Sequence, residues 1–439
     1  MKKYNLRNTI SMFLILPLLA ASPAFAIEGI DDFIDTVTLQ EQRADLTKNY
    51  GLTLRPYVKT GFDLTSNVFK ADKSPGAGEH DAMVWSVTPG IDMVHVGDYG
   101  RSGISYEADF KYVNRFEQAN TQDQDFLTYL NLKPTDTTYF NVSNRLTQTG
   151  AMPGSPTSEN INILDNRVIT KMGVNLESGQ TLEFGYQNYD HNFQETVASR
   201  YSYNENIYDW RIYQKTGEKQ RLYTGLKLGD VDFYNLSSRD TTYYEFPVGV
   251  EGDLYWGWRG NASVGLHHRN LHASDRNDVT RIVANIAVQK PFYWFESICP
   301  KEKDKGRLPT ALEFGFLRRP QEGTFSTATT YDEKMFYGSL KHLVTQKLRG
   351  RMAIYAGNQD YEDRVFTGTR VLVGNQLFVT TPDQVKRTDQ LFGYGIGFDY
   401  NVSRHMKLHL DYKYSRRESN VAGLDYTDNT LSLKTTIPL

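Results

Sequence analysis

Apolar and polar residues alternate along much of this chain, most clearly near its C-terminal end. In residues 406–415 (MKLHLDYKYS) the even-numbered residues are apolar or aromatic, and the odd-numbered residues are charged or polar. Successive side chains of a β-strand point to opposite faces, so this pattern predicts a strand with one apolar and one polar face. The same period of two recurs at 104–112, 168–176 and 392–400.

The lengths of the connections predict how these strands are arranged. Short turns are expected near 97–101, 134–136, 177–180, 215–218, 253–257, 344–347 and 402–404. Long loops are expected near 70–81, 116–123, 148–161, 194–203, 237–241, 270–276, 319–329, 362–387 and 419–424. Residues 291–308 are expected to form an unusually long connection on the short-turn side. Residues 219–236 are expected to form one long strand bent at Gly229-Asp230. Transmembrane barrels have short turns on the periplasmic side and longer loops outside.

We therefore predict an all-β fold: a single transmembrane antiparallel β-barrel of about 18 strands. Sixteen strands remain an alternative if one weak hairpin lies outside the membrane. A soluble β-sandwich is disfavoured, because the predicted strands exceed the five or six residues usual in soluble sheets and many end in Tyr, Phe or Trp.

Composition agrees with a barrel once the alternation is taken into account. Hydrophobic residues make up 39% of the 439 residues and mean hydropathy is −0.54, values that alone suggest a soluble protein. In a barrel only every second strand residue meets lipid, so mean hydropathy stays low, and the aromatic share of 13% suits interfacial girdles. The net charge of −3 argues against a nucleic-acid partner.

The first residues predict export. Lys2, Lys3 and Arg7 precede a short apolar run at 10–21, and Ala24-Phe25-Ala26 forms an A-x-A cleavage site. This is the layout of a signal peptide covering 1–26, and the run is too short for a spanning helix. We expect 27–50 to be an amphipathic helix in the periplasm or lumen, or a flexible lead-in. Residues 51–439 are expected to form the barrel, in the outer membrane of a Gram-negative bacterium.

Two further features bear on assembly. Cys299 is the only cysteine, so no intramolecular disulfide forms. Leu431, Leu433, Ile437 and Leu439 share one face of the last predicted strand, a pattern that favours insertion by the outer-membrane assembly machinery. Leu439 stands where an aromatic residue is commoner.

The polar phase of the strands supplies the candidate site. Two interpretations stay open: these charges pair with one another in a wet channel, or they form a weakly charged path for a polar polymer, with Tyr and Trp near the mouths stacking on sugar rings. Trp256 and Trp258 are better explained as interface anchors. The glycines near 395 are expected to leave an open strip where a polymer passes. The predicted pore-lining residues are Arg55, Lys59, Asp63, Glu107, Asp109, Lys111, Glu183, Glu313, Gly393, Gly395, Gly397, Asp399, Lys407, His409, Asp411 and Lys413.

Catalysis and cofactor binding are not predicted. His267 and His268 are adjacent on a strand, so they point to opposite faces and cannot share a site. Residues 79–81 (EHD) are a single loop triplet, too little for a metal site. The sequence has neither G-x-G-x-x-G nor a P-loop, so no nucleotide cofactor is expected.

Several short motifs resemble a known family. They are Tyr57 with 67–69 (NVF), 85–91 (WSVTPGI) and 114–116 (NRF), with Ser66 where the family usually has Asp. Over 51–439 the chain resembles the β-barrel porins encoded with exopolysaccharide biosynthesis clusters. The resemblance implies a pore that helps a secreted polysaccharide across the outer membrane, with periplasmic polysaccharide-export proteins as partners.

Two other functions remain open from the sequence. A general diffusion porin for small polar solutes would be favoured by a lumen of one sign and an inward-folded loop, for which 362–387 is the candidate. A non-conducting structural or adhesion barrel would have its lumen plugged by 27–50 or by side chains.

Overall fold

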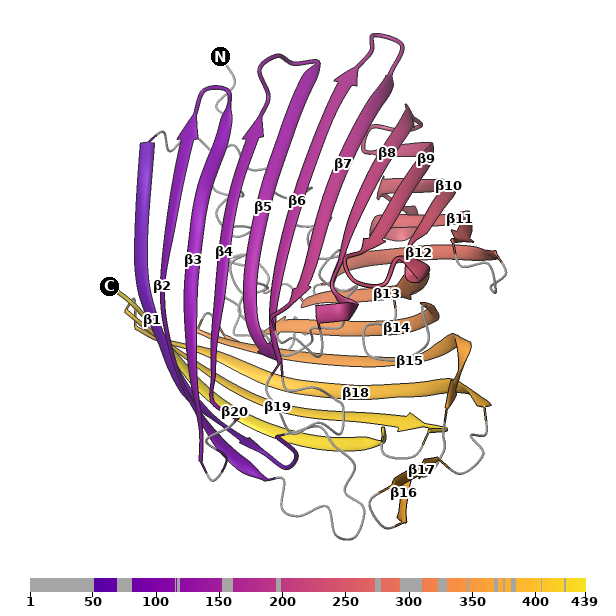
Figure 1. The fold of residues 1–439 in the computed structure, drawn as a ribbon. Helices are drawn as coiled ribbons and strands as arrows, with labels where there is room; N and C mark the ends of the chain where they lie inside the picture. The colour runs from indigo at the N-terminus through magenta and orange to yellow at the C-terminus, as the bar shows by residue number, and fades with distance from the viewer. Residues whose placement is uncertain are drawn as a thin grey trace.

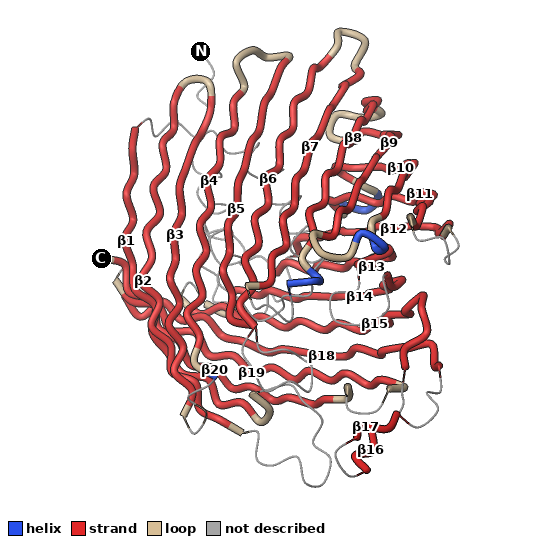
Figure 2. The backbone as a smooth tube through the Cα atoms, viewed as in Figure 1, coloured by secondary structure: helices blue, strands red, loops and turns tan. Residues whose placement is uncertain are grey.

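The alternating segments form long antiparallel strands in the computed structural model (Figures 1 and 2). The structure describes residues 51–68, 81–114, 116, 119–151, 161–194, 199–272, 278–292, 310–322, 330–345, 347–366, 370–373, 376–379, 384–403, 405–421 and 424–439. The predicted signal peptide, the segment 27–50 and Cys299 lie outside the described residues. Of the triplet 79–81, only residue 81 is described. None of the helical segments in the described part is long and apolar enough to span a membrane.

Eighteen strands form one sheet and a separate hairpin makes a second. The strands of the large sheet are β1 (Gly51–Thr65), β2 (Ala82–Gly97), β3 (Gly100–Val113), β4 (Thr121–Leu132), β5 (Thr138–Ala151), β6 (Ile161–Asn175), β7 (Gln180–Phe193), β8 (Tyr203–Lys215), β9 (Gln220–Phe233), β10 (Thr241–Asp253), β11 (Arg259–Leu271), β12 (Val279–Phe292), β13 (Thr310–Glu322), β14 (Thr330–Leu343), β15 (Leu348–Phe366), β18 (Gln384–Ser403), β19 (Met406–Ser419) and β20 (Tyr426–Pro438). The hairpin is β16 (Arg370–Val373) and β17 (Gln376–Val379), which lies apart from the wall in Figure 1.

The large sheet closes on itself. β1 pairs with β2 on one side and with β20 on the other, so Tyr57 lies opposite both Gly90 and Pro438. Closure leaves no sheet edge, which is what a barrel in lipid requires. The prediction of a closed antiparallel barrel with 18 strands is confirmed.

Five of the expected short turns are confirmed within the described residues. They are 98–99, 133–137, 176–179, 216–219 and the connection between β10 and β11, which holds a short 3-10 turn (Tyr255–Gly257). β9 is one strand, as expected. The expected loop 362–387 is shorter, because β15 continues to Phe366 and β18 begins at Gln384.

The register fixes the two faces of the sheet. Phe62 of β1 pairs with Trp85 of β2, and Ile396 of β18 pairs with Tyr412 of β19. These side chains belong to the outer face, where large apolar residues are exposed: Trp85 is 52% and Ile396 41% exposed. The alternate residues form the inner face, and apolar clusters such as Tyr203, Val231, Phe233 and Tyr243 pack there toward the long-loop end.

Candidate functional site: the inner face of the barrel

The strand registers bring the sequence-predicted residues together on one face. All sixteen lie at inward positions, on the opposite phase from the exposed apolar side chains. Fourteen lie on β1, β3, β18 and β19 around the β1–β20 junction, one lies on β7 and one on β13. Their charges face one another across neighbouring strands because the strand period of two keeps every second side chain on the same face.

Ion pairs link several of these residues. Lys59 Nζ lies 2.5 Å from Glu107 Oε1 across β2. Lys111 Nζ lies 3.4 Å from Asp109 Oδ2 and also contacts Asp123 of β4. Glu313 accepts hydrogen bonds from Ser339 Oγ at 2.5 Å and from Lys341 Nζ at 3.2 Å. At these positions the structure agrees with mutual pairing of charges.

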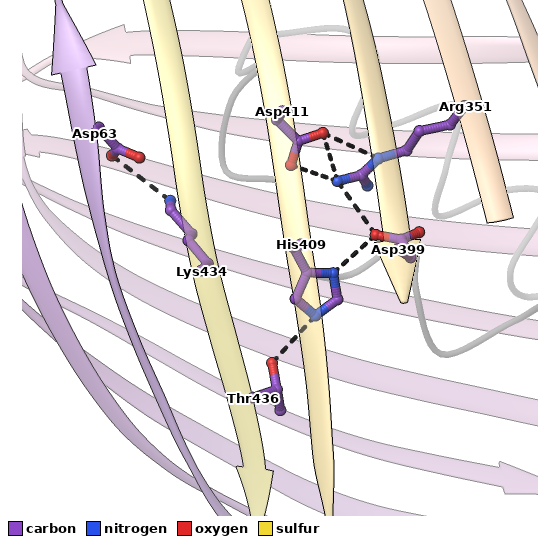
Figure 3. Close-up of polar contacts among 7 residues, drawn as sticks. All are labelled: Asp63, Arg351, Asp399, His409, Asp411, Lys434 and Thr436. Atoms are coloured by element: carbon purple, nitrogen blue, oxygen red, sulfur yellow. Dashed lines mark hydrogen bonds and ion pairs between the residues drawn. The ribbon is translucent and has the colours of Figure 1, made fainter. Parts of the chain in front are cut away.

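A larger network lies on β15, β18, β19 and β20, near the short-turn end (Figure 3). Arg351 Nη2 donates to Asp411 Oδ2 at 2.6 Å and lies 3.6 Å from Asp399 Oδ1. His409 Nδ1 lies 2.8 Å from Asp399 Oδ1, and its Nε2 lies 3.3 Å from Thr436 Oγ1. One arginine and one histidine therefore engage both carboxylates. Arg351 is missing from the sequence-predicted set, although it lies at a polar position of an alternating segment.

Tyrosines on the inner face lie flat against glycines of the next strand. The ring of Tyr57 covers Gly90, and its phenol donates to Glu107 one strand further on. In the same arrangement Tyr139 covers Gly173 and donates to Glu183. A Cβ on either glycine would meet the ring closer than carbon atoms can approach. Each such unit ties three strands together.

These tyrosines were not singled out from the sequence, which indicated only aromatics near the mouths. The available signal is a Tyr in the polar phase of a strand with a Glu in the polar phase two strands later. The hydrogen-bonded phenols are held against the wall and are part of the lining.

The expected open glycine strip is only partly open. The ring of Tyr355 covers Gly393, and the side chains of Arg351 and Asp411 lie over Gly397. Gly395 lies between Ala353 and Lys413 and is partly exposed. The prediction of an open row is wrong at Gly393 and Gly397 because small residues on a barrel wall accept the side chains of their neighbours.

A cavity of about 260 Å³ lies against the inner wall between β6 and β14. Charged groups of both signs line it, among them Glu183, Arg211 and Lys227, together with the rings of Tyr223 and Tyr337. The lining also includes apolar side chains such as Ile207, Val283 and Met335, so the cavity presents polar and apolar surface together.

The two neighbouring histidines lie on opposite faces, as predicted. His267 Nδ1 faces Glu245 Oε2 at 3.3 Å on the inner face, whereas His268 Nδ1 faces Thr280 Oγ1 at 2.7 Å on the outer face. Within the described ranges, no group of three or more His, Cys, Asp or Glu side chains is placed to hold a metal ion.

The barrel has relatives in one sequence family. Residues 51–438, from the first residue of β1 to the last residue of β20, match the family described as "Putative beta-barrel porin 2". The chain belongs to this porin family. Membership agrees with the strand count and points to a transport role rather than catalysis. The porin-type barrel places the protein in the outer membrane of a Gram-negative bacterium.

Solved outer-membrane barrels are similar in fold. OccK3 (OpdO) of Pseudomonas aeruginosa is 9% identical, with 91% of this chain and 99% of that one covered and a TM-score of 0.43. The siderophore receptor PirA of Pseudomonas aeruginosa is 9% identical, with 89% and 81% covered and a TM-score of 0.41. OccAB4 of Acinetobacter baumannii is 11% identical, with 89% and 99% covered and a TM-score of 0.41. No curated protein sequence matches the chain significantly.

Proposed function

We propose that this porin-like barrel is the outer-membrane conduit through which a secreted polysaccharide leaves the cell. The observation that carries the proposal is the chemistry of the inner face, where paired charges alternate with flat tyrosine rings. Sugars offer hydroxyl groups to charged and amide partners and a C–H face to aromatic rings. A wall that presents both suits a chain of sugars.

The strand number supports a passage of the necessary width. Barrels with 16 to 18 strands leave an aqueous channel, whereas eight strands leave only room for side chains. The resemblance to porins encoded with exopolysaccharide clusters favours the same cargo. Periplasmic export proteins would then meet the short-turn mouth, the assembly machinery would recognise β20, and lipid would surround the outer face.

Deletion of the gene tests the proposal. We expect the deletion strain to lose polysaccharide from the medium, and the wild-type gene to restore it. Normal secretion without the gene would contradict the export role. A conductance in planar bilayers, with swelling of proteoliposomes in small sugars and unchanged polysaccharide secretion, would instead favour a general diffusion porin. A closed barrel with no conductance would favour a structural or adhesion role.

A matched pair of variants locates the passage. Gly395→Trp adds a bulky ring on the inner face, and Ile396→Trp adds it on the outer face of the same strand. We expect the first to reduce secretion and conductance, and the second to leave both unchanged. Heat-modifiable gel migration checks that both variants fold. Normal secretion by folded Gly395→Trp would place the passage elsewhere on the inner face.

A further inference from the structure

The charge of the inner face is uneven in the strand halves next to the short turns. We call the strands β15, β18–β20 and β1–β3 the basic wall, and the strands β4–β14 the balanced wall. In these halves the balanced wall carries at inward positions Lys171, Arg211, Lys215, Arg221, Arg259 and Lys341 against Glu183, Asp209, Glu251, Asp253 and Glu313. The basic wall carries Arg55, Arg101, Arg349, Arg351, Lys407 and Lys434 against Asp92, Asp399 and Asp411.

On the balanced wall four of the six cations lie next to carboxylates. Arg259 Nε lies 2.7 Å from Asp253 Oδ1. Arg211 Nη2 lies 2.5 Å from Asp209 Oδ2, and Arg221 contacts Glu251. These pairs cancel most of the field that a solute would meet, because opposite charges at contact distance act together as a dipole.

On the basic wall all three carboxylates are engaged by nearby groups. Asp411 and Asp399 are held by Arg351, and Asp399 also by His409 (Figure 3). Asp92 accepts a hydrogen bond from Ser105 Oγ at 2.7 Å. The remaining basic side chains of this wall therefore outnumber the carboxylates that could balance them.

Arg55 and Lys407 are the clearest of these excess cations. Across the described residues neither forms a side-chain hydrogen bond or an ion pair. They project from β1 and β19, the two strands that flank β20. On β20 itself Lys434 lies level with Gly61 of β1 and His409 of β19, and its Nζ is 3.7 Å from Asp63 Oδ2 (Figure 3). Clefts lined by one sign of charge concentrate oppositely charged solutes and raise their rate of association about 10-fold or more at low salt.

We infer that the basic wall is a binding strip for acidic groups, and that the exported polymer is an acidic polysaccharide. The inference rests on the proposed function and names its cargo: sugars bearing carboxylate or sulfate groups. The strip lies at inward positions, so lipid headgroups around the barrel are not its ligand. Its place near the short turns, on the periplasmic side of such barrels, lets it capture the polymer before transit.

Purified full-length protein in planar bilayers tests the inference. The probes are polygalacturonate, dextran sulfate and uncharged dextran of matched length. We expect either anionic probe to reduce the ion current at a concentration at least about 10-fold lower than dextran does, and the difference to shrink as salt rises. Compared at equal concentrations of charge, the two anionic probes show whether the strip prefers carboxylate or sulfate groups.

A matched pair of variants assigns the effect to the basic wall. The double change Arg55→Gln with Lys407→Gln removes the two excess cations. Lys215→Gln removes a cation at the same end of the balanced wall. We expect the double variant to lose several-fold of the preference for anionic probes and of the selectivity for chloride over potassium, and Lys215→Gln to retain both.

The outcomes separate this inference from the proposed function. Equal block by dextran and polygalacturonate, or an equal effect of Lys215→Gln, would overturn the acidic cargo while leaving polysaccharide export in place. Normal secretion by the deletion strain would overturn export. If no current is found, binding of labelled polygalacturonate to the protein in detergent is measured instead. Loss of that binding in the double variant supports the binding strip, and unchanged binding overturns it.

Discussion

The two faces of the hairpin formed by β18 and β19 differ in polarity, because one faces lipid and the other faces water. On the outer face Phe392, Ile396 and Leu410 are 40 to 44% exposed and form an apolar surface. On the inner face, one residue along, Asp399 and His409 are buried in a polar network, at 8% and 9% exposure. The usual relation between burial and polarity is reversed, because the outer solvent is lipid and the inner one is water.

The two faces therefore restrict their side chains to different degrees. The outer face needs only apolar bulk, since lipid tails accept any apolar side chain. The inner face needs particular partners, since buried polar groups must be hydrogen-bonded. Substitutions on the two faces should therefore fail for different reasons and by different amounts.

A charge on the outer face should have the largest effect. Leu410→Arg puts a guanidinium into the apolar surface and should cost roughly 2–4 kcal/mol if the site lies near the midplane. Lys413→Arg keeps a cation on the inner face of the same strand and should cost little. Ser415, also on the inner face of β19, is 6% exposed and a poorer control. Unfolding titrations in lipid vesicles measure both, and equal costs would contradict the register, because a slip of one residue exchanges the faces.

Filling a glycine under a tyrosine should come next. Gly393→Val places a branched side chain where the ring of Tyr355 lies. Overpacking of this kind costs about 1–3 kcal/mol. Pairing it with Tyr355→Ala should recover part of that loss, because the ring is then absent. No recovery in the double variant would show that the strain comes from the backbone rather than from the ring.

The fold could be predicted from the sequence because the lipid-facing residues of each strand give a simple pattern of alternating apolar and polar residues. Residues 406–415 alternate throughout, and such segments with short turns between them are enough to count the strands. The hairpin β16–β17 and the extension of β15 to Phe366 were missed because they lie in the expected loop 362–387. Local alternation there is short and does not distinguish a strand from a loop.

The site could be predicted only as a set of inward residues. Alternation gives the phase of Glu107 and Glu183, and hence their face. It does not give their partners, because Tyr57 and Tyr139 reach them across an intervening strand. Such contacts depend on the register between neighbouring strands, and the residue pattern of a single strand does not give that register.

Loss of one such phenol should have a smaller effect. Tyr139→Phe removes the hydrogen bond to Glu183 and keeps the ring over Gly173. Glu183 retains Tyr213, whose phenol donates at 3.2 Å, so we expect a cost of about 1 kcal/mol. Glu183→Gln in both backgrounds completes a double-mutant cycle. A coupling energy near zero would mean that the phenol is not bound to the carboxylate in the membrane.

The smallest effect should mark where the apolar part of the outer face ends. Arg416 lies on the same face of β19 as Leu410, but further toward the long loops, where it contacts Glu418. Both side chains are about half exposed, at 50% and 49%, and exposed ion pairs contribute about 0–1 kcal/mol. Arg416→Gln should therefore change the unfolding free energy by less than about 0.5 kcal/mol.

Arg416→Leu should change the unfolding free energy equally little if this position lies at the headgroup level, and should stabilise the barrel if it lies within the hydrocarbon. Unfolding titrations of the two variants in vesicles of different thickness distinguish these cases, because a thicker bilayer moves the boundary toward Arg416. An unfolding free energy of Arg416→Leu that does not respond to thickness would place Arg416 outside the membrane altogether.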